Sequence, residues 1–93
     1  MAVIEIERFR LAAGVSDEEF RRLDAALQQW CYVAREGLAR RTTAVGADGE
    51  VVVVTVWHHD PTLPEEIDAP ANDELDRAID RSTYRREVFR TLG

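Results

Sequence analysis

The stretch "VVVVTVWHHD", residues 51–60, decides the fold. Six β-forming residues run into a tryptophan, two histidines and an aspartate. Because side chains alternate between the two faces of a strand, a strand with one side in water would carry a polar residue at every second position. Here valines occupy both sets of positions up to Val56. The stretch therefore predicts a central strand, residues 50–58, that is covered on both faces.

The clearest signal before this strand is a helix that opens at Ser16. Ser16 and Glu19 have the spacing of a capping box, in which two side chains satisfy free N–H groups at the helix start. Apolar residues then recur at steps of three and four, as one face of a helix requires: Phe20, Leu23, Leu27, Trp30 and Ala34. We expect the helix to end near Glu36, with Gly37 as its C-cap.

Three further strands and a second helix complete the predicted order. The strands are expected at residues 3–11, at residues 38–45 and in the tail, residues 82–93. The tail also fits a helical stripe, but a final strand would close an otherwise open sheet edge. Between residue 63 and Asp80 we expect a broken helix, because Pro70 interrupts the pattern after a short turn that is capped by Thr62 and Glu65.

The order β-α-β-β-α-β is that of a ferredoxin-like α+β fold with a four-stranded antiparallel sheet. The 93 residues are expected to form one domain, residues 1–93. In this fold both helices lie on one face of the sheet, so the other apolar face needs a partner. We expect that partner to be a second copy of the chain, which gives a homodimer through the sheet faces, a dimeric α/β barrel.

Charge and composition exclude several classes of partner. The net charge is −6, and every basic residue apart from the two histidines is an arginine. This sign opposes nucleic acid and anionic membrane surfaces. The apolar run at residues 51–54 is too short to span a membrane, and the start of the chain lacks the pattern of a signal peptide, so a cytoplasmic location is expected. Cys31 stands alone and is interpreted as a small hydrophobic residue.

Three stretches carry a resemblance to a known family: "VIEIERFRLAAGVSDEEF", "VVVVTVW" and "YRREVFRTLG". Together they resemble the dimeric α+β barrel superfamily and, within it, the antibiotic-biosynthesis-monooxygenase-like group. The resemblance implies a ligand pocket between the sheet and the helices of each subunit. Members of the group include cofactor-free oxygenases of phenolic polyketides, haem-degrading enzymes, polyketide cyclases and proteins with no assigned reaction.

Two departures from the family limit what the resemblance implies. Haem-degrading relatives use an Asn on the first strand and a His on the second helix, and residues 3–11 and 63–80 contain neither. Phenol-oxidising relatives carry an Asn shortly before the strand-end tryptophan, where this chain has Val and Thr. We therefore expect no haem and no other cofactor, and the oxygenase reaction is only one candidate.

Trp57 and His59 are the predicted catalytic residues. Trp57 stands at the position of the family's strand-end tryptophan, where its indole could stack on a flat substrate or simply fill the gap beneath the second helix. In a regular strand His59 shares its side, whereas His58 points to the other. A neutral imidazole is a natural base for a phenol or an acidic carbon, and Asp60 could orient it. The alternative is a solvated strand exit. No metal is expected, because adjacent side chains diverge.

Four more side chains are predicted to bind the substrate. Glu5 and Glu7 share one face of the first strand, where either could be a base with a raised pKa or could pair with arginines on the neighbouring strands. Tyr32 and Tyr84 could each donate a hydrogen bond to a substrate carbonyl, or could be packing residues.

Two functions follow from these residues. The first is a small homodimeric enzyme that acts on an aromatic or polyketide-like molecule as a cofactor-independent monooxygenase or cyclase. The alternative is a non-catalytic small-molecule-binding or interaction module on the same barrel, because a fold alone does not determine a function.

Overall fold

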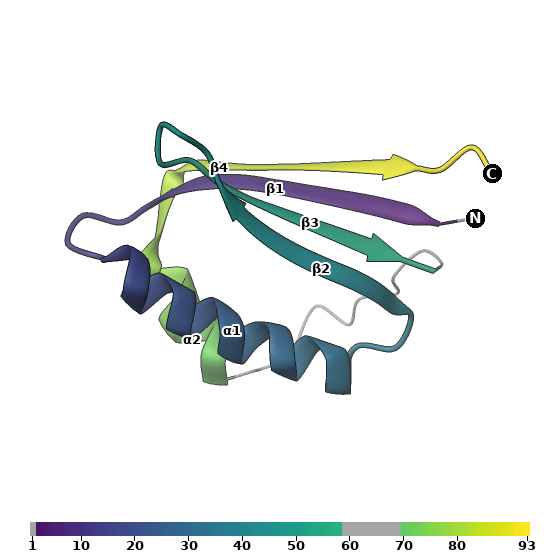
Figure 1. The fold of residues 1–93 in the computed structure, drawn as a ribbon, viewed down its shortest axis with the longest axis horizontal. Helices are drawn as coiled ribbons and strands as arrows, with labels where there is room; N and C mark the ends of the chain where they lie inside the picture. The colour runs from purple at the N-terminus through teal and green to yellow at the C-terminus, as the bar shows by residue number, and fades with distance from the viewer. Residues whose placement is uncertain (1, 59–69) are drawn as a thin grey trace.

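The computed structural model describes residues 2–58 and 70–93. Its elements follow the predicted order, with bounds β1 (Val3–Leu11), α1 (Asp17–Ala34), β2 (Leu38–Val45), β3 (Val51–Trp57), α2 (Pro70–Ala78) and β4 (Ile79–Arg90). The strands form one antiparallel sheet in the order β2-β3-β1-β4, and both helices lie on the same side of it (Figure 1). The predicted ferredoxin-like α+β fold is confirmed.

The start of α1 is the predicted one, and its end differs slightly. The Ser16 hydroxyl accepts a hydrogen bond from the Glu19 N–H at 3.1 Å, as the capping pattern requires. The helix ends at Ala34, two residues before the predicted end, and Arg35 is its C-cap. Gly37 has a φ of 84° and makes the turn into β2, a conformation that a residue with a Cβ rarely adopts.

The second half of the chain corrects two expectations. Pro70 was expected to break a helix, but it is the first residue of α2, where its fixed φ and missing N–H are tolerated. The tail is a strand, and it starts at Ile79 rather than at residue 82 because Ile79 pairs with Leu11. The predicted turn at Thr62 and Glu65 lies outside the described residues.

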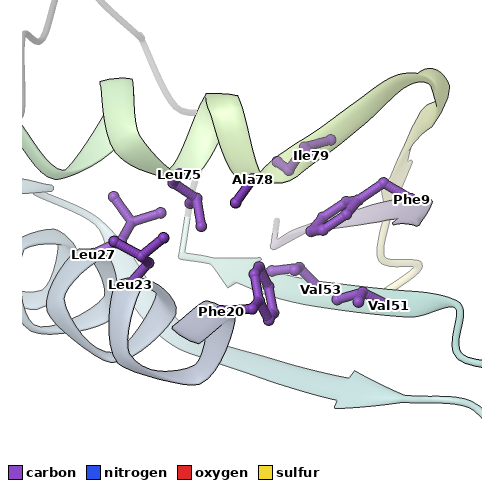
Figure 2. Packing of buried hydrophobic residues seen from close by; sticks show 9 residues of the cluster. All are labelled: Phe9, Phe20, Leu23, Leu27, Val51, Val53, Leu75, Ala78 and Ile79. Atoms are coloured by element: carbon purple, nitrogen blue, oxygen red, sulfur yellow. The ribbon is translucent and has the colours of Figure 1, made fainter. Parts of the chain in front are cut away.

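The hydrophobic core lies between the helices and the odd-numbered positions of β1 and β3. The Phe9 and Phe20 rings meet edge to face, with their centroids 5.8 Å apart. Figure 2 shows how side chains from both helices and the sheet gather into one buried cluster: Phe9, Phe20, Leu23, Leu27, Val51, Val53, Leu75, Ala78 and Ile79.

The opposite face of the sheet is apolar at its centre. The cross-strand register aligns Ile4 with Val56 and Phe89, and Ile6 with Val54. Phe89 is 47% exposed, and no described element covers this face. We call it the outer face; its apolar centre comprises Ile4, Ile6, Val52, Val54, Val56 and Phe89.

Candidate functional site

A cavity of about 240 Å³ lies between the sheet and the two helices. All four strands contribute to its floor, and its walls come from the C-terminal half of α1 and from α2. The lining mixes aromatic rings with charged groups, which include Glu5, Glu7, Trp30, Arg35, Trp57 and Tyr84. Ligand sites commonly combine an apolar lining with a few polar groups in this way.

The Glu7 carboxyl is held on the cavity floor by Tyr84. The Tyr84 hydroxyl donates a hydrogen bond to Glu7 Oε2 at 2.6 Å. Burial raises the pKa of Glu7, the hydrogen bond from Tyr84 works against that rise, and the nearby Glu5 carboxylate adds to it. Burial and the hydrogen bond to Glu7 likewise raise the pKa of Tyr84. The phenol thus stays protonated, and the carboxyl is a weaker acid and a stronger base than a free glutamate.

Glu5 is neutralised by an arginine of the neighbouring strand. Its carboxylate binds Arg86 Nε, although Glu5 is only 8% exposed. The Glu5 hydrogen bond is the main cause of a raised pKa of the Arg86 guanidinium. The predicted pairing of a strand-one glutamate with an arginine is therefore confirmed for Glu5, whereas the hydrogen-bond partner of Glu7 is Tyr84.

Two tryptophans and an arginine form the other end of the site. The Arg35 guanidinium carbon lies 5.8 Å from the centroid of Trp30 and 5.8 Å from that of Trp57. Both distances are within the range of a cation–π interaction. Trp57 is 5% exposed. Its Nε1 and the Nε of Arg35 are buried and have no hydrogen-bond partner among the described residues.

The cavity brings together four of the six predicted site residues: Glu5, Glu7, Trp57 and Tyr84. Tyr32 does not line it; its hydroxyl accepts a hydrogen bond from the Arg41 backbone N–H at 2.9 Å. His59, with Asp60, lies outside the described residues, so its predicted role stays a prediction. His58, which was not a site prediction, is exposed at the end of β3.

Sequence reasoning missed the contributions of Trp30, Cys31 and Arg35. Trp30 belongs to the apolar stripe of α1, which pointed only to the core, and Arg35 follows that helix directly. Burial raises the pKa of the Cys31 thiol, which also lines the cavity. Their role depends on where α1 ends relative to β3, and no local pattern contains that information.

Within the described parts of the chain, residues 2–58 and 70–93, no cluster of three or more His, Cys, Asp or Glu side chains is placed to hold a metal ion. None of the helices described there has the length and apolar character needed to cross a membrane.

No protein-family model matches the sequence, and no curated protein matches it. Several solved structures match this chain in fold. SnoaB, a cofactor-independent oxygenase from Streptomyces nogalater, is 20% identical with a TM-score of 0.72, over 99% of this chain and 94% of SnoaB. A proposed antibiotic biosynthesis monooxygenase from Chloroflexus aurantiacus is 15% identical with a TM-score of 0.69, over 100% and 95% of the two chains. The chain has the fold of these proteins.

A third solved structure adds a description of assembly. It is a dimeric protein of unknown function with a ferredoxin-like fold from Bacteroides fragilis, 12% identical with a TM-score of 0.65, over 97% of this chain and 96% of that one. At these identities the likeness concerns the fold, so it confirms the predicted resemblance at the level of the fold.

Proposed function

We propose that the protein is a homodimeric enzyme that removes a proton from an aromatic or polyketide-like small molecule, as a cofactor-independent monooxygenase or a cyclase. The single observation that carries this proposal is the Glu7 carboxyl, which has a raised pKa and lies in a cavity with two indoles. The fold shared with a cofactor-independent oxygenase is consistent with it.

Glu7 is the proposed base. A general base works best when its pKa lies near the working pH, and burial moves Glu7 in that direction. Its ionised carboxylate takes a proton from a phenol or from an acidic carbon of the ligand. The carbanion, or the phenolate with negative charge on a ring carbon, then reacts in one of two ways. In an oxygenase it gives electrons to O₂, one oxygen atom ends on that carbon and the other leaves as water; in a cyclase it attacks a carbonyl of the same molecule. Tyr84, hydrogen-bonded to Glu7, holds the carboxylate in place.

Trp57 is the proposed stacking surface for the substrate ring, with Trp30 as a second aromatic wall. His59 follows Trp57 by two residues and keeps the role predicted from the sequence, as a second candidate base. Tyr84 and Glu5 stay proposed substrate-binding residues. Tyr32 lies away from the cavity lining and would contribute by positioning β2 through Arg41.

The proposed dimer forms through the outer face. Burying its valines, isoleucines and Phe89 would remove apolar surface from water, which favours association by roughly 25 cal/mol per Å². The dimeric Bacteroides fragilis protein of the same fold is consistent with this assembly.

A non-catalytic ligand-binding module is the alternative. It is favoured by the Tyr84 hydroxyl, which already occupies one oxygen of the proposed base. In a binding module the Glu7–Tyr84 pair would only shape the cavity.

The test measures O₂ uptake and absorbance with anthrone-type and naphthol-type phenols. We expect Glu7→Gln to lower the rate by roughly 100-fold, the scale of a lost general base. Glu36→Gln, at an exposed position after α1, is the matched control and should keep the rate. Full activity in Glu7→Gln together with loss in His59→Ala would transfer the role to His59. Full activity in both variants would contradict a side-chain base, and no turnover of any compound would favour the binding module.

A further inference from the structure

We propose that the cavity selects aromatic ligands that carry a carboxylate, and that the Nε–H of Arg35 and the Nε1–H of Trp57 donate the hydrogen bonds that bind it. This inference deepens the proposed function by naming a ligand class. It rests on that function only in taking the cavity as the ligand site.

The two donors lack an acceptor. Arg35 Nε and Trp57 Nε1 are both buried, both residues line the cavity, and neither atom has a hydrogen-bond partner in the described parts of the chain. Most buried polar atoms in proteins are hydrogen-bonded, because an unpaired donor loses its water without compensation. Two such donors at one cavity indicate that an acceptor atom of a ligand forms the missing hydrogen bonds.

The charges around the cavity favour an anion. Four of its charged residues belong to ion pairs in the structure: Glu5 with Arg86, Arg41 with Asp24, and Arg81 with Asp76, which both line the cavity. The Glu7 carboxyl, whose pKa burial raises, accepts a hydrogen bond from the Tyr84 hydroxyl and is not paired with a cation in the described residues. Among the described lining residues, Arg35 is the cation for which no carboxylate partner is found. A carboxylate would therefore supply the missing counter-charge.

The nearby thiol does not supply that counter-charge. The positive charges of Arg41 and Arg35 lower the pKa of the Cys31 thiol. Burial has the larger and opposite effect, so the pKa is raised and Cys31 stays protonated. The positive charge of Arg35 is left for a ligand.

The aromatic part of the ligand class follows from the two indoles. Trp30 and Trp57 both contact the Arg35 guanidinium and both line the cavity. The buried Nε–H of this guanidinium lies away from water, where a hydrogen bond is stronger. A flat ring beside them would stack while its carboxylate reaches Arg35. The cavity of about 240 Å³ is small compared with the roughly 300–1,000 Å³ of most ligand pockets, so the ligand is small.

The test is isothermal titration calorimetry with two probes of the same shape, 2-naphthoate and the neutral 2-naphthamide. We expect the wild-type protein to bind the carboxylate about tenfold more tightly than the amide, the scale of one charge-assisted hydrogen bond. Arg35→Gln should abolish this preference and leave amide binding nearly unchanged. Trp57→Phe, which keeps a ring and loses the N–H, should weaken naphthoate binding several-fold.

Arg22→Gln is the matched control, because it removes the same charge from an exposed position of α1. It should keep the preference, and circular dichroism should show that every variant is folded. The inference would be overturned if the wild-type protein bound the two probes equally or bound neither. It would also be overturned if Arg35→Gln kept the preference for naphthoate and Trp57→Phe bound naphthoate as tightly as the wild type. The assay does not depend on turnover, so naphthoate selectivity without oxygenase or cyclase activity would reject the proposed enzyme and keep this inference.

Discussion

Among single residues, Glu7 carries the sharpest chemical constraint. A carboxyl on the central part of a sheet is stable only if it is neutral, paired or hydrogen-bonded. Its neighbour Glu5 is paired with Arg86, whereas Glu7 has the Tyr84 hydroxyl and a raised pKa. The two glutamates, two positions apart on one strand face, are thus in different states. Glu5 is held by an ion pair with Arg86, whereas Glu7 is held by a hydrogen bond and is the proposed base.

The raised pKa of Glu7 predicts a pH-dependent stability. In the unfolded chain Glu7 loses its proton near its ordinary pKa of about 4.5, whereas in the folded protein it keeps the proton to a higher pH. The free energy of unfolding therefore falls as the pH rises from 4.5 through the folded pKa. Glu7→Gln removes this penalty. We expect the variant to melt several degrees higher than the wild type at pH 8 and at about the same temperature at pH 4. Thermal unfolding followed by circular dichroism measures the difference, and a constant difference across this range would contradict the raised pKa.

Removing the partner of Glu5 should destabilise the protein. In Arg86→Gln a nearly buried carboxylate loses its cation, and we expect a loss of about 1–3 kcal/mol in urea unfolding. Arg85→Gln is the matched control, because Arg85 is exposed and pairs with Glu50 at 3.1 Å. Its loss should stay below about 1 kcal/mol. Equal losses in the two variants would contradict a structural role for the Glu5 pair.

At the scale of elements, a buried ion pair links α1 to β2. Arg41 of β2 binds Asp24 of α1 at 2.8 Å, and their side chains are 7% and 13% exposed. Arg41 also donates to Gln28 and, through its backbone N–H, to Tyr32, one and two helical turns further along. This set of contacts fixes the position of the α1 C-terminus, where Trp30 and Arg35 enter the cavity.

Breaking this pair should loosen α1. Asp24→Asn leaves the Arg41 guanidinium buried without a counter-charge, and we expect a loss of about 3 kcal/mol in urea unfolding. The exposed pair of Arg10 with Asp48 serves for comparison, and Asp48→Asn should have a much smaller effect. Wild-type stability in Asp24→Asn would show that helix packing alone positions α1.

At the scale of the whole molecule, the sheet has two apolar faces and a single layer of helices. One face closes the cavity and the other is the proposed dimer contact. We expect the wild-type protein to have the mass of two chains in analytical ultracentrifugation. Val54→Asp places a charge at the centre of the outer face and should give single chains. Ala25→Asp adds the same charge on the exposed side of α1 and should leave the dimer intact. A monomeric wild type at micromolar concentration would contradict the dimer.

The fold could be predicted from the sequence because its signals are local. The run of β-forming residues in "VVVVTVW", the cap at Ser16 and the turn at Gly37 each lie within a few residues. The errors arose where a local signal has two meanings. Pro70 can break a helix or begin one, and it begins α2. The cytoplasmic location and the dimer stay predictions.

The candidate site was harder to predict because it depends on distant contacts. Glu5, Glu7 and Tyr84 could be proposed, since strand pairing places them on one face. Tyr32 could not be excluded without the position of β2, to which it bonds. The contact of Arg35 with the two indoles joins the end of α1 to the end of β3. The spacing of residues along the sequence does not predict such a contact.

The claim that the cavity beneath the sheet is the ligand site can be tested most directly by NMR. The chain has two tryptophans, so a ¹H–¹⁵N spectrum has two indole N–H signals, and Trp57→Phe assigns them. On titration with 2-naphthoate, the Trp57 indole signal should move downfield as its N–H gains an acceptor, while the amides of Val52 and Val54 stay unchanged. Changes confined to the outer face, or no change in the Trp57 signal, would contradict the account.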